Sequence, residues 1–269
     1  MPGVVLVICD GLGDRPARLH LGFMEHLVEE QRATRYTSRA ARPTNSRPNY
    51  ETLHTGVSPA VHGITSNYVT RRSHRPNTFS LAAAAGLVTA ASAYSWISEL
   101  YVSAPFDPHT EMEVIDPDGA IHHGRFYFLD ETPDAEVFAR AATLTARYRP
   151  DYLLVHPMAV DNAGHKHGGE SHQYAEAVGG QDELLATVVP GWVAAGYTVI
   201  VTADHGHKPS GGHGGTSDHE VETPLFIVSP AGGQGDTAET VDHTSVAPTI
   251  WASLGLTATP ADAGAAIAL

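Results

Sequence analysis

The sequence of 269 residues is long enough to bury a full hydrophobic core, and its composition is typical of a soluble globular protein. The formal net charge of -14 argues against a nucleic-acid backbone or an anionic membrane as a partner, because both select basic surfaces. The sequence has no run of about 18 apolar residues that would span a bilayer.

Short apolar runs alternate with amphipathic stretches in the first part of the chain. We predict a strand at 4–9, a helix at 21–32, an alanine-rich helix at 80–86 and a strand at 88–95. The first strand begins at once, with no basic stretch, apolar run and small-residue cleavage site before it. We therefore expect no signal peptide and a cytoplasmic location.

The same alternation continues to the end of the chain. A helix is predicted from Thr132 through Leu144, and the elements that follow are a strand at 152–155, a helix at 173–195, strands at 198–202 and 225–228, and a closing helix at 245–254. Such an order of strands and helices predicts an α/β fold in which helices cover both faces of a mainly parallel central sheet.

One segment departs from this rhythm. Residues 111–128 contain two strand-like runs around the sequence DPDG at 116–119, which is a strong turn signal. We predict a small β-hairpin insertion there, within a region of about residues 97–131. The sequence has no low-complexity linker, repeat or block of like charge, so we expect residues 1–269 to form a single domain.

Acidic residues and histidines follow the predicted strands. In doubly wound sheets, ligands bind beyond the carboxyl ends of the strands. Asp10 follows the first strand, and Asp204 with His205 follows the strand at 198–202. Two short motifs, DNAGH at 161–165 and GGHGG at 211–215, add further ligand types. Mixed clusters of Asp and His suit Zn²⁺ or a close relative such as Mn²⁺, and bound cations would attract a small anionic substrate despite the acidic net charge.

A further motif carries a hydroxyl group. Residues 43–56 read PTNSRPNYETLHTG, and residues 58–67 read SPAVHGITSN. With the Asp and His motifs, this arrangement resembles the nucleotide pyrophosphatase/phosphodiesterase branch of the alkaline phosphatase superfamily. The pattern of that branch is a hydroxyl nucleophile two residues before Pro-Asn, then Thr-Gly, His-Gly-Ile and an Asn. Six motifs stand in the family's order and span most of the chain.

The resemblance implies an alkaline phosphatase-like fold and a phosphoester hydrolase with two divalent metal ions. Ser46 would be the nucleophile, and Asn67 would help to hold a phosphate oxygen. The metal ligands would be side chains of Asp and His, with one ion on Asp161, His165 and His213 and the other on Asp10, Asp204 and His205. Three carboxylates and one serine alkoxide would balance the charge of two divalent cations.

Arg47 departs from the family pattern, because diesterases of this branch usually carry an apolar residue just after the nucleophile. A guanidinium group there is expected to pair with a second anionic group of the substrate, such as the extra charge of a phosphomonoester or a carboxylate. Arg71 and Arg72 are alternative anion-binding residues.

Several residues have alternative interpretations. His219, His207 and His243 compete with His213 as ligands. Ser46 would also suit a helix N-cap, with Pro48 near the first helical position, and the two roles are compatible. Residues 44 and 45 are expected in a turn, with His62 structural and His167 facing solvent.

The substrate class stays open between phosphodiesters, nucleotides, phosphomonoesters and phosphonates such as phosphonoacetate. A sulfatase is disfavoured, because its pattern needs Arg four residues after the modified residue, where this chain has Tyr50. A mutase would need a substantial extra domain between Asn67 and Asp161. A non-catalytic metal-binding protein is disfavoured because every expected position is filled.

Overall fold

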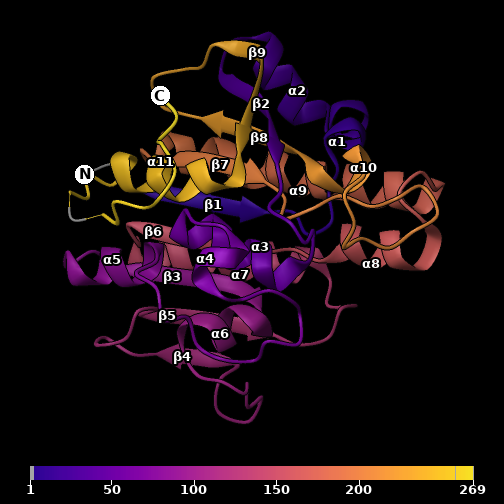
Figure 1. Ribbon diagram of the computed structural model, residues 1–269. Helices are drawn as coiled ribbons and strands as arrows, with labels where there is room; N and C mark the ends of the chain where they lie inside the picture. The colour runs from indigo at the N-terminus through magenta and orange to yellow at the C-terminus, as the bar shows by residue number, and fades with distance from the viewer. Residues whose placement is uncertain (1–2, 258, 269) are drawn as a thin grey trace.

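The strands form one mixed sheet. The computed structural model describes residues 3–257 and 259–268 (Figure 1). The strands in this part of the chain are β1 (Val4–Ile8), β2 (Ala33–Arg39), β3 (Thr89–Tyr94), β4 (Glu113–Ile115), β5 (His123–Tyr127), β6 (Tyr152–Val155), β7 (Thr198–Thr202), β8 (Glu222–Val228) and β9 (Gly235–Asp242). Their order across the sheet is β4-β5-β3-β6-β1-β7-β8-β2-β9.

Most neighbouring strands run in parallel. Strands β5, β3, β6, β1 and β7 pair in parallel, and β9 pairs in parallel with β2. Strands β4 and β8 run antiparallel to their neighbours. The mainly parallel sheet predicted from the sequence is therefore confirmed. Strand β1 lies at its centre and is buried on both faces, which explains its unbroken apolar sequence.

Helices cover both faces of this sheet (Figure 1). Their bounds are α1 (Asp14–His20), α2 (Gly22–Glu29), α3 (Ser46–Thr55), α4 (Pro59–His62), α5 (Thr78–Ala84), α6 (Ser95–Tyr101), α7 (Asp134–Tyr148), α8 (Ala159–His167), α9 (His172–Ala194), α10 (Asp218–Val221) and α11 (Val246–Ser253), with a 3₁₀ turn at His243–Ser245. None of these helices is both long enough and apolar enough to cross a bilayer.

The alternation of side chains along β1 divides the interior into two cores. Val5 and Val7 pack with apolar residues of α1, α2, α7 and α9. Leu6 and Ile8 point to the opposite face and pack with residues of α3, α5, α6 and α11. Helix α3, which begins at Ser46, thus lies against the second core.

The predicted hairpin is present at the edge of the sheet. Val114 in β4 lies opposite Gly124 in β5, and the two strands are antiparallel. Strand β5 also pairs in parallel with β3. The segment therefore extends the central sheet as well as forming a hairpin.

Candidate active site and metal centre

Parallel strand ends bring the first ligand group together. Ile8 at the end of β1 pairs with Thr202 at the end of β7, so the residues that follow emerge at the same edge of the sheet. Asp10, Asp204 and His205, which we call the Asp10 group, are fully buried there. Each offers one ligand atom, and these atoms lie within 4.8 Å of one another. The structure thus brings together three of the predicted metal ligands.

The Asp10 group also contacts the predicted nucleophile. Ser46 Oγ lies 3.1 Å from His205 Nε2. The same nitrogen is 3.2 Å from Asp204 Oδ2 and 3.7 Å from Asp10 Oδ1. Both of these buried carboxylate oxygens lack a hydrogen-bond partner among the residues that the structure describes. Buried anionic oxygens are costly without a partner, and a divalent cation would supply one.

A second ligand group lies beside the first. It contains Asp161, His165, His207 and His213, and we call it the Asp161 group. Asp161 and His165 share one face of α8, because residues four apart lie one above the other on a helix. His165 Nε2 is 3.5 Å from Asp161 Oδ2, and His213 Nε2 is 3.1 Å from His165 Nε2. The three residues predicted to bind one metal ion, Asp161, His165 and His213, are therefore neighbours.

The loop that carries His213 is attached to the segment before the nucleophile. His213 Nδ1 donates to the carbonyl oxygen of Thr44 at 2.8 Å, which leaves Nε2 facing the Asp161 group. The Thr44 hydroxyl accepts from the Gly214 N–H and donates to the Gly215 carbonyl, each at 3.0 Å. Gly214 has a φ of 104°, and a Cβ there would lie 2.8 Å from Asn45 Oδ1. Thr44 is thus a buried anchor as well as a turn residue.

Ser46 is the first residue of α3. Asn45 is the N-cap residue, and its own side chain forms no cap hydrogen bond. The alternative role of Ser46 as an N-cap is therefore wrong, because its hydroxyl contacts His205 instead. Asn67 Oδ1 accepts from the Arg47 backbone N–H at 3.0 Å, so Asn67 lies next to the helix N-terminus. A helix N-terminus favours anions, and because the Arg47 N–H is bonded to Asn67 and Pro48 has none, the Ser46 N–H is the one in the first three positions of α3 that could bind a phosphate oxygen.

Electrostatics at the site also favour bound cations. Burial, followed by the charge of Asp10, raises the pKa of Asp204 well above its ordinary value. The same two causes raise the pKa of Asp161 to about 7. Burial and the neighbouring His213 lower the pKa of His205, so its imidazole is neutral and free to bind a metal. Three buried carboxylates and neutral imidazoles form a donor set that fits two divalent cations.

Two residues that sequence reasoning missed hold Asp10 in place. His156 Nε2 lies 2.9 Å from Asp10 Oδ2, and the Tyr50 hydroxyl donates to the same oxygen. Although burial raises the pKa of Asp10, these hydrogen bonds lower it below its ordinary value. They also leave Oδ1 free to face the site. His156 directly follows β6, and that position after a strand was the signal that could have identified it.

Removing the His156 side chain should weaken metal binding at the Asp10 group. Outer-shell partners of metal ligands typically contribute about 10- to 100-fold to metal affinity. We therefore expect His156→Ala to raise the Kd for the metal of the Asp10 group by about that factor, measured by competition with a chelator. His62→Ala is the control, because His62 is also buried but bonds Thr52 and Ile64. Equal affinities for the two variants would contradict this role for His156.

Arg47 is buried rather than open to solvent. Its side chain is 2 % exposed, and Nη2 lies 2.6 Å from Glu99 Oε2. The guanidinium carbon lies 4.6 Å from the centre of the Trp96 ring. Nε and Nη1 have no hydrogen-bond partner in the part of the chain that the structure describes. Glu99 thus already balances the charge of Arg47, and its role towards a substrate stays a prediction.

The alternative anion-binding residue Arg71 donates to backbone carbonyls, those of Arg72 and His62. Those bonds use one N–H of each terminal nitrogen of its guanidinium group and hold the side chain against the backbone.

The ion pair of Arg47 and Glu99 should matter for stability. Glu99→Gln would leave a buried guanidinium without its counter-charge, and breaking a buried pair costs about 3 to 5 kcal/mol. We expect the free energy of unfolding in urea to fall by about this amount. Glu113→Gln is the matched control, because Glu113 is exposed and its pair with Arg125 should contribute at most about 1 kcal/mol. A similar small loss in both variants would show that Glu99 does not neutralise Arg47.

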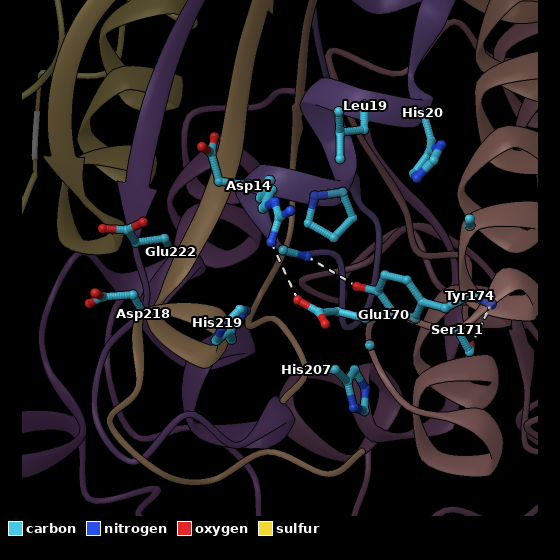
Figure 2. Close-up of a pocket in the computed structure, with 15 residues that line it drawn as sticks. Asp14, Leu19, His20, Glu170, Ser171, Tyr174, His207, Asp218, His219 and Glu222 are labelled. Carbon is cyan, nitrogen blue, oxygen red and sulfur yellow. Dashed lines mark hydrogen bonds and ion pairs between the residues drawn. The ribbon is translucent and has the colours of Figure 1, made fainter. Parts of the chain in front are cut away.

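The other candidate histidines have different positions. His243 is buried and contacts Thr223 and Asn49, and His219 lines a neighbouring cavity of about 550 Å³. Figure 2 shows this cavity, and His207 is another of the residues that line it. Of the three competitors of His213 considered from the sequence, only His207 belongs to a ligand group. It joins His213 there and does not replace it.

Comparisons with solved structures show the same fold. Murine ectonucleotide pyrophosphatase / phosphodiesterase 5, in an inactive form in complex with AMP, has a TM-score of 0.76 at 14% identity, with 98% of both chains covered. A 2-O GAG sulfatase has a TM-score of 0.68 at 14% identity and covers 99% of this chain and 73% of its own. These likenesses confirm the alkaline phosphatase-like architecture.

Sequence comparisons are more specific. GPI ethanolamine phosphate transferase 3, catalytic subunit, from Homo sapiens is 33% identical over 110 residues, which cover 39% of this chain and 10% of that protein. The human transferase 2 catalytic subunit is 25% identical over 270 residues, which cover 94% of this chain and 26% of that protein. The chain thus spans only about a tenth to a quarter of the length of these relatives. The family of type I phosphodiesterase / nucleotide pyrophosphatase matches residues 4–222, which include the Asp10 group, Ser46 and the whole Asp161 group. The chain belongs to this family.

Proposed function

We propose that the protein is a phosphoester hydrolase in which Ser46 is the nucleophile at a centre of two divalent metal ions. The observation that carries the proposal is the position of Ser46 Oγ, 3.1 Å from His205 Nε2 and beside carboxylate oxygens that lack partners among the described residues. Asp10, Asp204 and His205 would hold one ion, and Asp161, His165 and His213 the other. Zn²⁺ suits these donors best, and Mn²⁺ is the alternative.

When bound, the two cations would lower the pKa of the serine hydroxyl and stabilise charge on the attacking and leaving oxygens. Ser46 Oγ then forms a bond to phosphorus as the bond to the leaving-group oxygen breaks, giving a phosphoserine. Water hydrolyses this intermediate in a second step and regenerates the hydroxyl. The helix N-terminus and Asn67 orient the phosphoryl oxygens during both steps.

The substrate class that we favour is a small phosphodiester or nucleotide. The family match and the fold shared with an ectonucleotide pyrophosphatase / phosphodiesterase support this choice. Phosphomonoesters and phosphonates such as phosphonoacetate are the alternative on the same scaffold. The similarity to ethanolamine phosphate transferases supports a second candidate function, in which an alcohol replaces water as the acceptor of the phosphoryl group.

A substrate panel tests this proposal. It would contain bis-p-nitrophenyl phosphate, p-nitrophenyl phosphate, a nucleotide anhydride and phosphonoacetate, each with Zn²⁺, Mn²⁺ and Mg²⁺. We expect turnover of a diester or nucleotide with Zn²⁺ or Mn²⁺, and added alcohol would divert product if the protein is a transferase. Bound metal without turnover of any compound would favour a non-catalytic metal-binding protein.

We also propose that Arg47 binds a second negatively charged group of the substrate through Nε and Nη1, the nitrogens that do not pair with Glu99. A charge-assisted hydrogen bond contributes about 1.5 to 3 kcal/mol, so Arg47→Ala should lower kcat/KM about ten- to a hundredfold for a dianionic monoester. Singly charged diesters should lose much less. Arg71→Ala, measured on the same two substrates, is the control. Equal losses for monoester and diester would remove this role from Arg47.

A further inference from the structure

His207 has the geometry of a metal ligand. Its side chain is fully buried, and Nε2 lies 2.7 Å from Asp161 Oδ1. The centre of its ring lies 5.0 Å from that of His165 and 5.2 Å from that of His213, while His165 and His213 are 4.9 Å apart. The three imidazoles are therefore almost equally spaced, with Asp161 completing the group.

The spacing of the donor atoms fits one zinc ion that is tetrahedral at rest and would become five-coordinate when an oxygen of the substrate binds. Asp161 Oδ1 lies 2.7 Å from His207 Nε2 and 3.8 Å from His213 Nε2, and Asp161 Oδ2 lies 3.5 Å from His165 Nε2. The Nε2 atoms of His165 and His213 are 3.1 Å apart. A tetrahedral zinc ion with bonds of about 2.0 to 2.1 Å has ligand atoms about 3.3 Å apart. The observed values lie on both sides of this figure. We infer that His207 Nε2 is a fourth protein ligand in the Asp161 group, an inference that rests on the proposed two-metal function.

The protein holds the His207 ring in this position. A Cβ on Gly164 would lie 2.5 Å from His207 Cδ2, and one on Gly169 would lie 2.7 Å from the His207 carbonyl oxygen. Both glycines thus let the chain close tightly around this residue. The next residue is fixed as well, because the Lys208 carbonyl accepts from the Gly169 N–H at 3.0 Å. The ring is therefore confined next to Asp161.

Three imidazoles would give this position a metal preference of its own. Imidazole nitrogen favours zinc, whereas carboxylate and hydroxyl oxygen suit manganese and magnesium. The Asp161 group would offer three nitrogens and one carboxylate. The Asp10 group, with Ser46, would offer mainly oxygen. His207 thus makes the Asp161 group the zinc-selective position of the pair.

Zinc X-ray absorption distinguishes a ligand from a hydrogen-bond donor. Asp204→Asn serves as the parent, because the amide oxygen still accepts from the Gly11 N–H while the Asp10 group loses a charge. One equivalent of zinc should then occupy the Asp161 group, with three imidazoles in its first shell. Adding His207→Gln keeps a hydrogen-bond donor for Asp161. It should nevertheless reduce the number of imidazoles bound to zinc to two and raise the zinc Kd about 100-fold. His167→Gln is the control, because His167 is exposed and outside the group.

Each outcome separates this inference from the proposed function. Two imidazoles in the parent, or an unchanged count and Kd after His207→Gln, would overturn the ligand role of His207 and leave the two-metal hydrolase intact. A parent that binds no zinc would overturn both. If His207→Gln does not fold, the imidazole count of the parent, three or two, decides the question.

Discussion

Ser46→Ala is expected to lower kcat by on the order of a thousandfold or more, because the variant lacks the only hydroxyl that contacts His205 among the described residues. The fold should persist, since the Ser46 hydroxyl forms no helix cap. Ser46→Thr keeps a hydroxyl and should retain part of the activity. The measurement is steady-state turnover of a diester with saturating metal.

Metal content provides the control for that experiment. The Ser46→Ala variant should still bind the same number of ions, since the substitution leaves all six predicted Asp and His ligands unchanged. Near-normal turnover in the alanine variant would remove Ser46 from the mechanism. Loss of metal together with activity would mean that the Ser46 hydroxyl is required to bind the metal, so the loss of activity could not be assigned to its role as nucleophile.

The second large effect concerns the metal ions themselves. Elemental analysis of the protein reconstituted with Zn²⁺ should show about two ions per chain, one for each ligand group. Removing them with EDTA should abolish turnover, and Zn²⁺ or Mn²⁺ should restore it. Asp204→Asn should hold about one ion and lose most activity, because a neutral side chain replaces a buried anionic ligand. One ion or none in the reconstituted wild-type protein would contradict the two-metal centre.

The central elements were predictable because burial leaves a clear pattern. Strands β1, β6 and β7 are short apolar runs, since helices cover both of their faces. The acids and histidines that follow them are conspicuous beside such runs. This contrast identified most members of both ligand groups, and the sequence motif supplied Ser46.

The strands near the far edge of the sheet were missed for the opposite reason. Strand β2 reads ATRYTSR, and its buried Arg35 forms ion pairs with Glu25 and Asp236. Strand β9 is polar and largely exposed. Neither has the alternation of apolar and polar residues that indicates a strand. Their pairing with distant strands and the ion pairs of Arg35 are tertiary contacts, and these cannot be read from local sequence.

The site residues that the sequence did not place, such as Tyr50, were missed for a similar reason. Helix α3 is buried along its whole length, so it lacks the amphipathic period that would have placed Tyr50 one turn after Ser46. His207 lies close to His165 only because the chain folds α8 against the segment after β7. Spacing along the sequence does not reveal such contacts between distant segments.

The most direct test of a Ser46 nucleophile is to stop the reaction by rapid denaturation during turnover and analyse the peptide that contains residues 43–56 by mass spectrometry. We predict a phosphoryl group on Ser46 in the wild-type protein and none in the Ser46→Ala variant. Active protein that never carries a phosphoryl group on Ser46, even when the second step is slowed by low temperature, would contradict the proposed mechanism.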